Sequence, residues 1–210
     1  MKQNGENRGG RENKANKENR GDRENKANKT NGENRENKEI RKPAGDPSDA
    51  PALTDEEVGA LLAILKERGE SITTAESLTA GMISARLADI PGCSDVMGRA
   101  FVTYCDDAKH EMVKVKRKTL KKWTAVSGKC AKQMAKGGAK MSGAEACISA
   151  TGYAGPPSGP EDKTVGLVYL GCFYRGKTSV EEHHYTGTRN DIRARAMNDA
   201  LRLLGKMLKQ

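Results

Sequence analysis

The first 43 residues of the chain almost entirely lack the apolar side chains from which a folded core is built. Ile40 is the only branched aliphatic residue among them, and the segment instead repeats the triplets ENR, ENK and ANK. A segment with so little apolar surface cannot offset the entropy lost on ordering. We therefore expect residues 1–50 to form a disordered, low-complexity tail and linker.

Two other interpretations of the repeat are weaker. A solenoid unit needs its own apolar face, and recurrent Asn and Gly oppose a helix laced with charge pairs. A basic arm that contacts nucleic acid needs an excess of cations, yet residues 1–50 hold 13 Lys and Arg against 10 Asp and Glu. This charge is too mixed for a strong anion-binding arm.

The chain also lacks the marks of secreted, metal-binding and membrane proteins. Its five cysteines are odd in number and contain no CxxC pair, and its three histidines show no ligand spacing. No apolar run approaches the roughly 18 residues of a membrane span, and the N-terminus has no apolar signal segment. We expect reduced thiols, no metal, no membrane partner and a cytoplasmic protein.

Helical and strand patterns alternate through residues 51–210. A capping box at Thr54 and Glu57 starts a first helix, and we expect later caps at Asp106 or Asp107, at Ser127, and at Asn190 or Asp191. Strands are expected in SITT, AFVTY, ACISA, VGLVYLGCFY and SVEEHHYTG. This order predicts one α/β domain, a three-layer α/β/α sandwich with a mixed sheet.

Ligands of such sheets gather where strands end, and the chain has three candidate junctions: AESLTAG, TYCDDAK and TGYAGP. In the first, Ser77 is expected at a strand-to-helix junction, where free backbone N–H groups can hold an oxyanion or phosphate. The simpler interpretations are that Ser77 is a helix cap and that Glu76 is a first-turn acid favoured by the helix dipole.

Lys109 falls in the first turn of a predicted helix, where a cation opposes the dipole and the neutral amine is favoured. A neutral lysine can act as a general base for a serine, and Tyr104 can relay a proton between the two. Tyr104 is otherwise a strand-end packing residue. The TGYAGP loop is either an ordinary connection or a backbone cradle in which Gly152 and Gly155 admit a ligand and Thr151 adds a hydroxyl.

Residues Lys114–Lys122 and the adjacent Trp123 form the most basic stretch of the predicted domain. A solvated helix face or loop is the simple interpretation. The alternative is a surface that contacts RNA or DNA, on which Trp123 stacks with a base.

The motifs AESLTAG, DIPGCSDV, FVTYCDDAK, AVS, TGYAGP, VGLVYLG and GTR occur in this order over about residues 53–209. Together they resemble the C-terminal domain of the CinA family, which includes the nicotinamide-nucleotide amidohydrolases. The resemblance implies an α/β/α enzyme, in a homo-oligomer, that hydrolyses nicotinamide mononucleotide to nicotinic acid mononucleotide and ammonia without a metal or organic cofactor. The repeat tail stands where many members carry a larger N-terminal domain.

The resemblance also implies roles for individual residues. Ser77 is expected to be the nucleophile, Lys109 its base, directly or through Tyr104, and Thr151 a hydrogen-bonding group near the amide. Expected substrate-binding residues are Glu76, Thr79, Gly81, Gly152, Gly155 and, for the phosphate, Arg189, whose fork can bind it bidentately.

The chain departs from the usual family pattern at Ala80, where Gly is common, at Cys105-Asp106-Asp107, at Tyr153 and at Pro157-Ser158. These departures leave open a catalytically impaired member that binds nucleotide or nucleic acid through its basic stretch.

Overall fold

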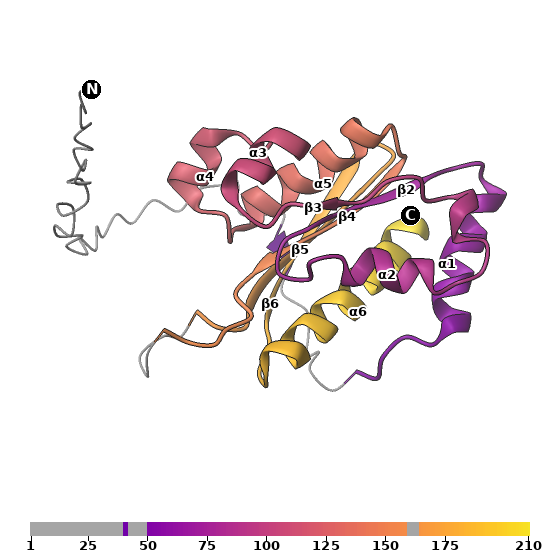
Figure 1. Ribbon diagram of the computed structural model, residues 1–210. Helices are drawn as coiled ribbons and strands as arrows, with labels where there is room; N and C mark the ends of the chain where they lie inside the picture. The colour runs from indigo at the N-terminus through magenta and orange to yellow at the C-terminus, as the bar shows by residue number, and fades with distance from the viewer. Residues whose placement is uncertain (1–39, 42–49, 159–163) are drawn as a thin grey trace, which may run out of the picture. The chain divides into compact units, whose positions relative to one another are not determined.

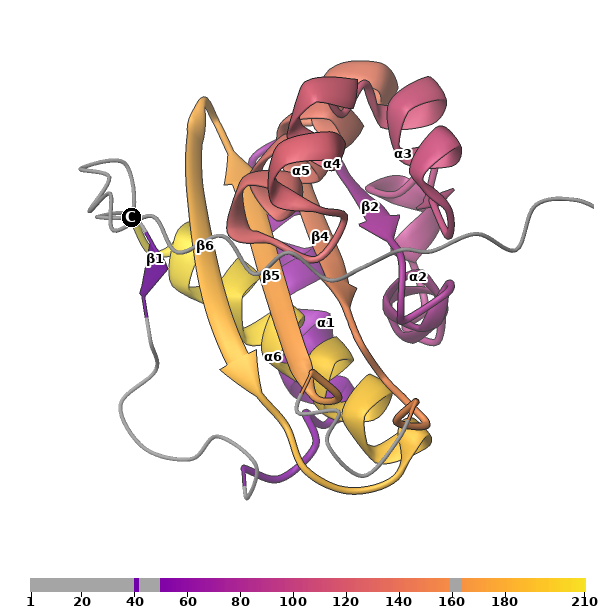
Figure 2. The ribbon, with the colours of Figure 1, turned by 90° about the vertical axis from the view of Figure 1, so that its left-hand side faces the viewer.

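A mixed β-sheet organises the part of the chain that the computed structural model describes, residues 40–41, 50–158 and 164–210. Its strand order is β1-β6-β5-β4-β2-β3 (Figures 1 and 2). Strands β2, β3 and β4 run parallel, β5 is antiparallel to both β4 and β6, and β1 is parallel to β6. The strands are β1 (Ile40–Arg41), β2 (Ile72–Glu76), β3 (Phe101–Val102), β4 (Ala146–Gly152), β5 (Leu167–Tyr174) and β6 (Lys177–His184).

Helices cover both faces of the sheet, which makes three layers (Figure 1). One face is covered by α6 (Arg189–Leu208) with α1 (Asp55–Glu67) and α2 (Met82–Ala88), followed by the short helix η3 (Cys93–Asp95). The other face is covered by α5 (Gly128–Ser142), on which α3 (Asp106–Val113) and α4 (Arg117–Trp123) pack. The α/β/α sandwich predicted from the sequence is confirmed.

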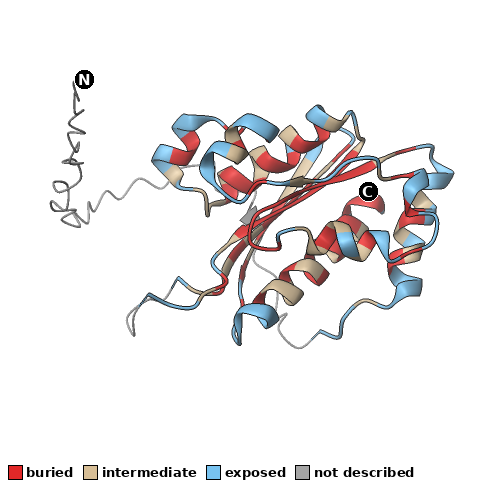
Figure 3. Cartoon of the chain, viewed as in Figure 1, coloured by how far each residue is buried: buried red, intermediate tan, exposed pale blue. Residues whose placement is uncertain are grey.

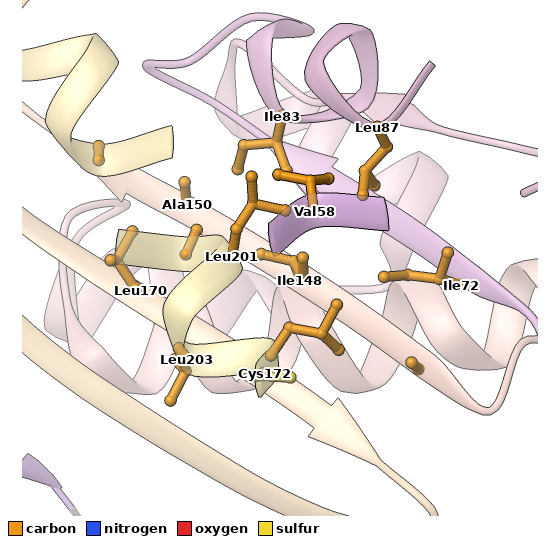
Figure 4. Packing of buried hydrophobic residues seen from close by; sticks show 14 of the residues in the cluster. Val58, Ile72, Ile83, Leu87, Ile148, Ala150, Leu170, Cys172, Leu201 and Leu203 are labelled. Atoms are coloured by element: carbon orange, nitrogen blue, oxygen red, sulfur yellow. The ribbon is translucent and has the colours of Figure 1, made fainter. Parts of the chain in front are cut away.

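The larger apolar cluster lies between the sheet and the α1, α2 and α6 layer (Figure 4). Val58 of α1, Ile83 of α2 and Leu201 of α6 are fully buried there and pack toward Ile148 of β4. Burial of each such side chain stabilises the fold by about 1.5–3 kcal/mol relative to exposure.

The face under α5 is built from smaller residues. Its apolar cluster includes Ala75, Cys130, Met134 and Cys147, and the outward sides of α3, α4 and α5 are exposed (Figure 3). At Gly137 of α5 a Cβ would lie 1.7 Å from the Val113 carbonyl oxygen, so only glycine lets α3 approach this closely. This close approach brings α3 to the end of β2.

Two of the predicted helix starts match the structure, and three differ. The Thr54–Glu57 capping box and the Ser127 cap are confirmed. The cap of α3 is Cys105, whose sulfur accepts from the Ala108 N–H, and not an aspartate. The cap of α6 is Thr188, with Asp191 completing a capping box. Helix α2 begins only at Met82, because a tight turn follows β2 first.

The predicted tail at residues 1–50 falls mostly outside the described residues. Ile40–Arg41 within it form β1, which pairs with Val180 and Glu181 of β6. In the described part of the chain, no helix has both the length and the apolar character needed to cross a membrane.

Candidate active site

The candidate residues gather at one edge of the sheet because the carboxyl ends of β2, β3, β4 and β6 all lie there. The segments that follow β2, β3 and β6 carry Ser77, Lys109 and Arg189, and Thr151 lies within β4, one residue before its end. Residues far apart in the sequence therefore meet at this edge, as is general for ligand sites of α/β sheets.

Ser77 lies in a turn between β2 and α2 and not at the helix N-terminus. Its backbone N–H donates to the Ala150 carbonyl at 2.9 Å, which fixes it beside the end of β4. The N-terminus of α2 is already occupied, because the Glu76 carboxylate accepts from the N–H groups of Gly81, Ile83 and Ser84 at 2.9–3.1 Å. The expectation that this helix end holds an oxyanion or phosphate is therefore wrong.

Glu76 is fully buried, and Thr74 Oγ1 also donates to it at 3.0 Å. Its carboxylate therefore caps a helix, and the predicted substrate-binding role is replaced by a structural one. Gly81 is the N-cap residue of α2 with φ of +96°, a backbone conformation that favours glycine.

Lys109 is the largest fully buried side chain near this edge. Its Nζ lies 3.0 Å from Ser77 Oγ and donates to the Thr103 carbonyl at 2.8 Å. Burial lowers the pKa of Lys109, and this effect is opposed by Cys130, Asp106 and Cys105 in that order. Desolvation, rather than the helix dipole considered from sequence, is thus the main cause that favours the neutral amine.

Thr151 is buried at the end of β4, where its hydroxyl donates to the Ala125 carbonyl at 2.7 Å. A Cβ at Gly152 would lie 2.7 Å from the Leu167 carbonyl oxygen, so this glycine is required by the close approach of β5. The approach of a ligand is not needed to explain it. Gly155 has φ of +79° and adopts a conformation that glycine favours.

Tyr104 and Arg189 contact each other at the outer rim of the site. One guanidinium nitrogen of Arg189 donates to Tyr104 Oη at 3.0 Å, and another donates to the Gly155 carbonyl at 2.5 Å. Tyr104 is 59% exposed, and no hydrogen bond of the described residues joins it to Ser77 or Lys109. The contact between Lys109 and Ser77 is direct.

Arg193, which sequence reasoning missed, holds the turn that carries Ser77. Its guanidinium donates to the carbonyls of Leu78 and Thr79 at 2.9 and 3.1 Å. The signal for it is spacing, because Arg193 lies one helical turn after Arg189 on the same side of α6.

The hydrogen bond from Arg193 to the Leu78 carbonyl orients the N–H group of Thr79, which belongs to the same peptide unit. In a trans peptide the N–H points opposite to the C=O, so the Thr79 N–H points away from Arg193 and α6. No hydrogen bond of the described residues uses this N–H, and the buried Thr79 Oγ1 is also without a partner. Two unpartnered donors at one residue, two positions after Ser77, are rare inside a protein.

A metal centre is not apparent at this edge. The described residues contain no group of three or more His, Cys, Asp or Glu side chains placed to hold an ion.

Comparisons with known proteins point to one family. The model of the CinA C-terminal domain matches residues 55–208. A Clostridium botulinum (strain Okra, type B1) protein named as competence-damage inducible is 43% identical over 171 residues, which cover 81% of this chain and 41% of that protein. The chain therefore spans about two fifths of the length of such curated relatives.

Solved structures match along almost their whole chains. The crystal structure of the competence/damage inducible protein CihA from Agrobacterium tumefaciens is 38% identical, with a TM-score of 0.70, and the match covers 77% of this chain and 99% of that one. The competence damage-inducible protein A structure from Klebsiella pneumoniae is 31% identical with a TM-score of 0.70, and it covers 75% and 99%.

Proposed function

The chain belongs to the CinA C-terminal domain family, and we propose that it hydrolyses the carboxamide of nicotinamide mononucleotide to nicotinic acid mononucleotide and ammonia. The observation that carries this proposal is the buried Lys109 amine 3.0 Å from the Ser77 hydroxyl. An amine whose pKa is lowered by burial is suited to take a proton from a serine, and no histidine is then needed.

The reaction follows from this pair in two steps. Ser77 Oγ attacks the amide carbon while Lys109 Nζ takes the hydroxyl proton, and the tetrahedral intermediate then breaks its C–N bond. Lys109 returns the proton to the leaving nitrogen, which departs as ammonia and leaves an ester on Ser77. Water, deprotonated by Lys109, hydrolyses the ester, and the acid product and free Ser77 result.

The negative charge of each tetrahedral intermediate needs hydrogen-bond donors. The Thr79 N–H, held in orientation by Arg193, and the Thr79 hydroxyl are two donors of this turn that have no hydrogen-bond partner among the described residues. Removal of one such donor typically costs about 100- to 1,000-fold in rate. Thr79 thus keeps the substrate-contacting role expected from the sequence, and in this proposal that role is to stabilise the charge of the intermediate.

The polar groups at the rim suit the other end of the substrate. Arg189 is exposed and has a planar fork, although its contacts to Tyr104 and Gly155 occupy part of it. A substrate phosphate that replaces one of these contacts gives Arg189 a charge-assisted hydrogen bond. We assign Tyr104 to this rim, where it orients Arg189.

The test is a chemical assay of the purified chain. With nicotinamide mononucleotide, the proposal predicts equal amounts of ammonia and nicotinic acid mononucleotide, and much slower turnover of free nicotinamide, which lacks the phosphate. A folded protein that releases no ammonia from the nucleotide contradicts the proposed function. Faster turnover of free nicotinamide contradicts the role of Arg189.

A further inference from the structure

Helices α4 and α5 carry a concentration of positive charge that the proposed amidase reaction does not use. Residues 112–144 contain ten Lys and Arg and not one Asp or Glu. Residues 51–210 as a whole hold 24 Lys and Arg against 18 Asp and Glu, so without this segment the domain has four more acids than bases. The charge is segregated onto one helix pair and is not spread over the domain.

The cations of α5 lie along one side of the helix. Lys129, Lys132, Lys136 and Lys140 are spaced three, four and four residues apart, and the opposite side of α5 packs on the sheet. A spacing of four residues corresponds to about 6 Å along a helix. This stripe presents cations at nearly regular intervals along about 16 Å.

A pocket of about 340 Å³ opens between α4 and the start of α5. Its lining residues are Lys116, Lys118, Thr119, Lys122, Trp123, Lys129 and Gln133, and no acid is among them. The Nζ atoms of Lys122 and Lys129 lie 5.3 and 4.2 Å from the centre of the Trp123 ring. An aromatic ring within a set of cations offers a stacking surface beside phosphate-binding groups.

We propose that this surface, the α4–α5 cationic face, binds single-stranded nucleic acid, with one base in the Trp123 pocket and phosphates along the lysines. A simple solvated helix face needs charge but gives no reason for the complete exclusion of acids. Arg117 pairs with Asp107 of α3 at 2.8 Å and lies at the edge of the face. The pocket is small for a duplex but has room for one unstacked base.

The single tryptophan of the chain makes the test direct, because its fluorescence reports only on this pocket. Titration with a thymidine oligonucleotide at low salt is expected to quench Trp123, with an affinity that falls steeply as salt rises. Heparin, a polyanion without bases, is expected to displace the oligonucleotide but to quench less. Equal quenching by heparin, or binding that salt does not weaken, overturns the proposal.

Two double variants with the same change in net charge distinguish binding by this face from a general effect of net charge. Lys118→Glu with Lys122→Glu is expected to weaken binding at least about tenfold. Lys177→Glu with Lys209→Glu changes the net charge equally at exposed positions outside the face, and it is expected to weaken binding by less than about threefold. Equal losses in the two double variants overturn the proposal.

The tryptophan is tested separately with a labelled oligonucleotide, since Trp123→Leu removes the reporter. Loss of stacking is expected to weaken binding about tenfold. Circular dichroism and unchanged ammonia release check that the variant is folded. Two results overturn the proposal. One is full oligonucleotide affinity in the folded variant, which excludes a base in the Trp123 pocket. The other is a Trp123 emission shift with anionic lipid vesicles while the oligonucleotide gives none.

Discussion

The two faces of the sheet differ in what they bury. Under α1, α2 and α6 lies a broad cluster of aliphatic side chains such as Leu201 and Ile148. Under α3, α4 and α5 the cluster is smaller, and the buried residues on that side include polar groups such as Lys109 and Thr151. One face therefore supplies most of the apolar stabilisation, while the other tolerates a buried amine and places it against Ser77.

The largest expected effect is a loss of stability when a side chain is removed from the aliphatic face, the face of the sheet that α1, α2 and α6 cover. Leu201→Ala removes a fully buried side chain between α6 and the sheet, and we expect the free energy of unfolding to fall by about 2–5 kcal/mol. Met112→Ala, at a position 39% exposed on the other face, is expected to change it by less than about 0.5 kcal/mol. Urea unfolding of both variants measures the difference, and equal losses would erase the contrast between the faces.

The next largest effect is on turnover, and it is expected from substitutions at the polar face, the side of the sheet that α3, α4 and α5 cover. Ser77→Ala and Lys109→Met are each expected to lower kcat/KM for the nucleotide by at least about 100-fold, because they remove the nucleophile or its base. Both variants should remain folded. A folded variant with a wild-type rate contradicts the pair.

The pH dependence of stability gives a second test of the lowered pKa of Lys109. The pKa of Lys109 is lower in the folded protein than in the unfolded chain. At pH values between these two pKa values the unfolded chain binds more protons, so the stability of the wild type rises with pH in this range. Lys109→Met lacks this titration. We therefore expect it to be at least as stable as wild type near pH 7, with an advantage that shrinks as pH approaches the ordinary lysine range.

Arg193 lies on α6, on one face of the sheet, and holds the turn that carries Ser77 of the active site. Its substitution tests whether this contact supports catalysis. Arg193→Ala frees the Leu78 and Thr79 carbonyls, and we expect kcat to fall by about tenfold or more while KM changes little, since the Thr79 donor acts on the transition state. Arg193→Lys should restore part of the rate. Arg195→Ala, which loses a contact to Thr186 instead, is the control and should keep the wild-type rate.

Asp106 gives a smaller effect, through charge. Its carboxylate raises the pKa of Lys109 against the larger effect of burial, so Asp106→Asn leaves more of the amine neutral near pH 7. We expect the rise of kcat/KM with pH to occur at lower pH in this variant, and the rate at pH 7 to increase by less than about fivefold. Both changes should be smaller at high salt. Asp107→Asn, whose carboxylate pairs with Arg117, should leave this rise at its wild-type pH. An upward shift for Asp106→Asn would refute the electrostatic account.

The smallest effect concerns backbone strain beside Ser77. Ala80 has φ of +50°, a conformation that costs a residue with a Cβ about 1 kcal/mol relative to glycine. Ala80→Gly should raise the free energy of unfolding by up to about 1 kcal/mol. Thermal unfolding checks this, and a loss of stability would mean that the turn does not need glycine there.

Sequence patterns predicted the layers because periodicity and caps are local, as at Thr54 and Ser127. They placed the start of α2 too early because helical periodicity alone does not show the turn that follows Glu76, across which its carboxylate caps the helix. Ser77 and Lys109 were predicted as a pair, but their distance depends on how closely α3 packs on α5 at Gly137, which is a tertiary property. Arg193 was missed for the same reason, since its partners lie 114 and 115 residues away.

The central claim is that burial keeps the Lys109 amine ready to accept a proton from Ser77. The most direct measurement is nitrogen NMR of the lysine side chains across pH, with the Lys109 signal assigned by its loss in Lys109→Met. The account predicts that this one amine titrates below the ordinary lysine value, and that Asp106→Asn lowers its midpoint further. A Lys109 signal that titrates with the exposed lysines, or above them, would contradict it.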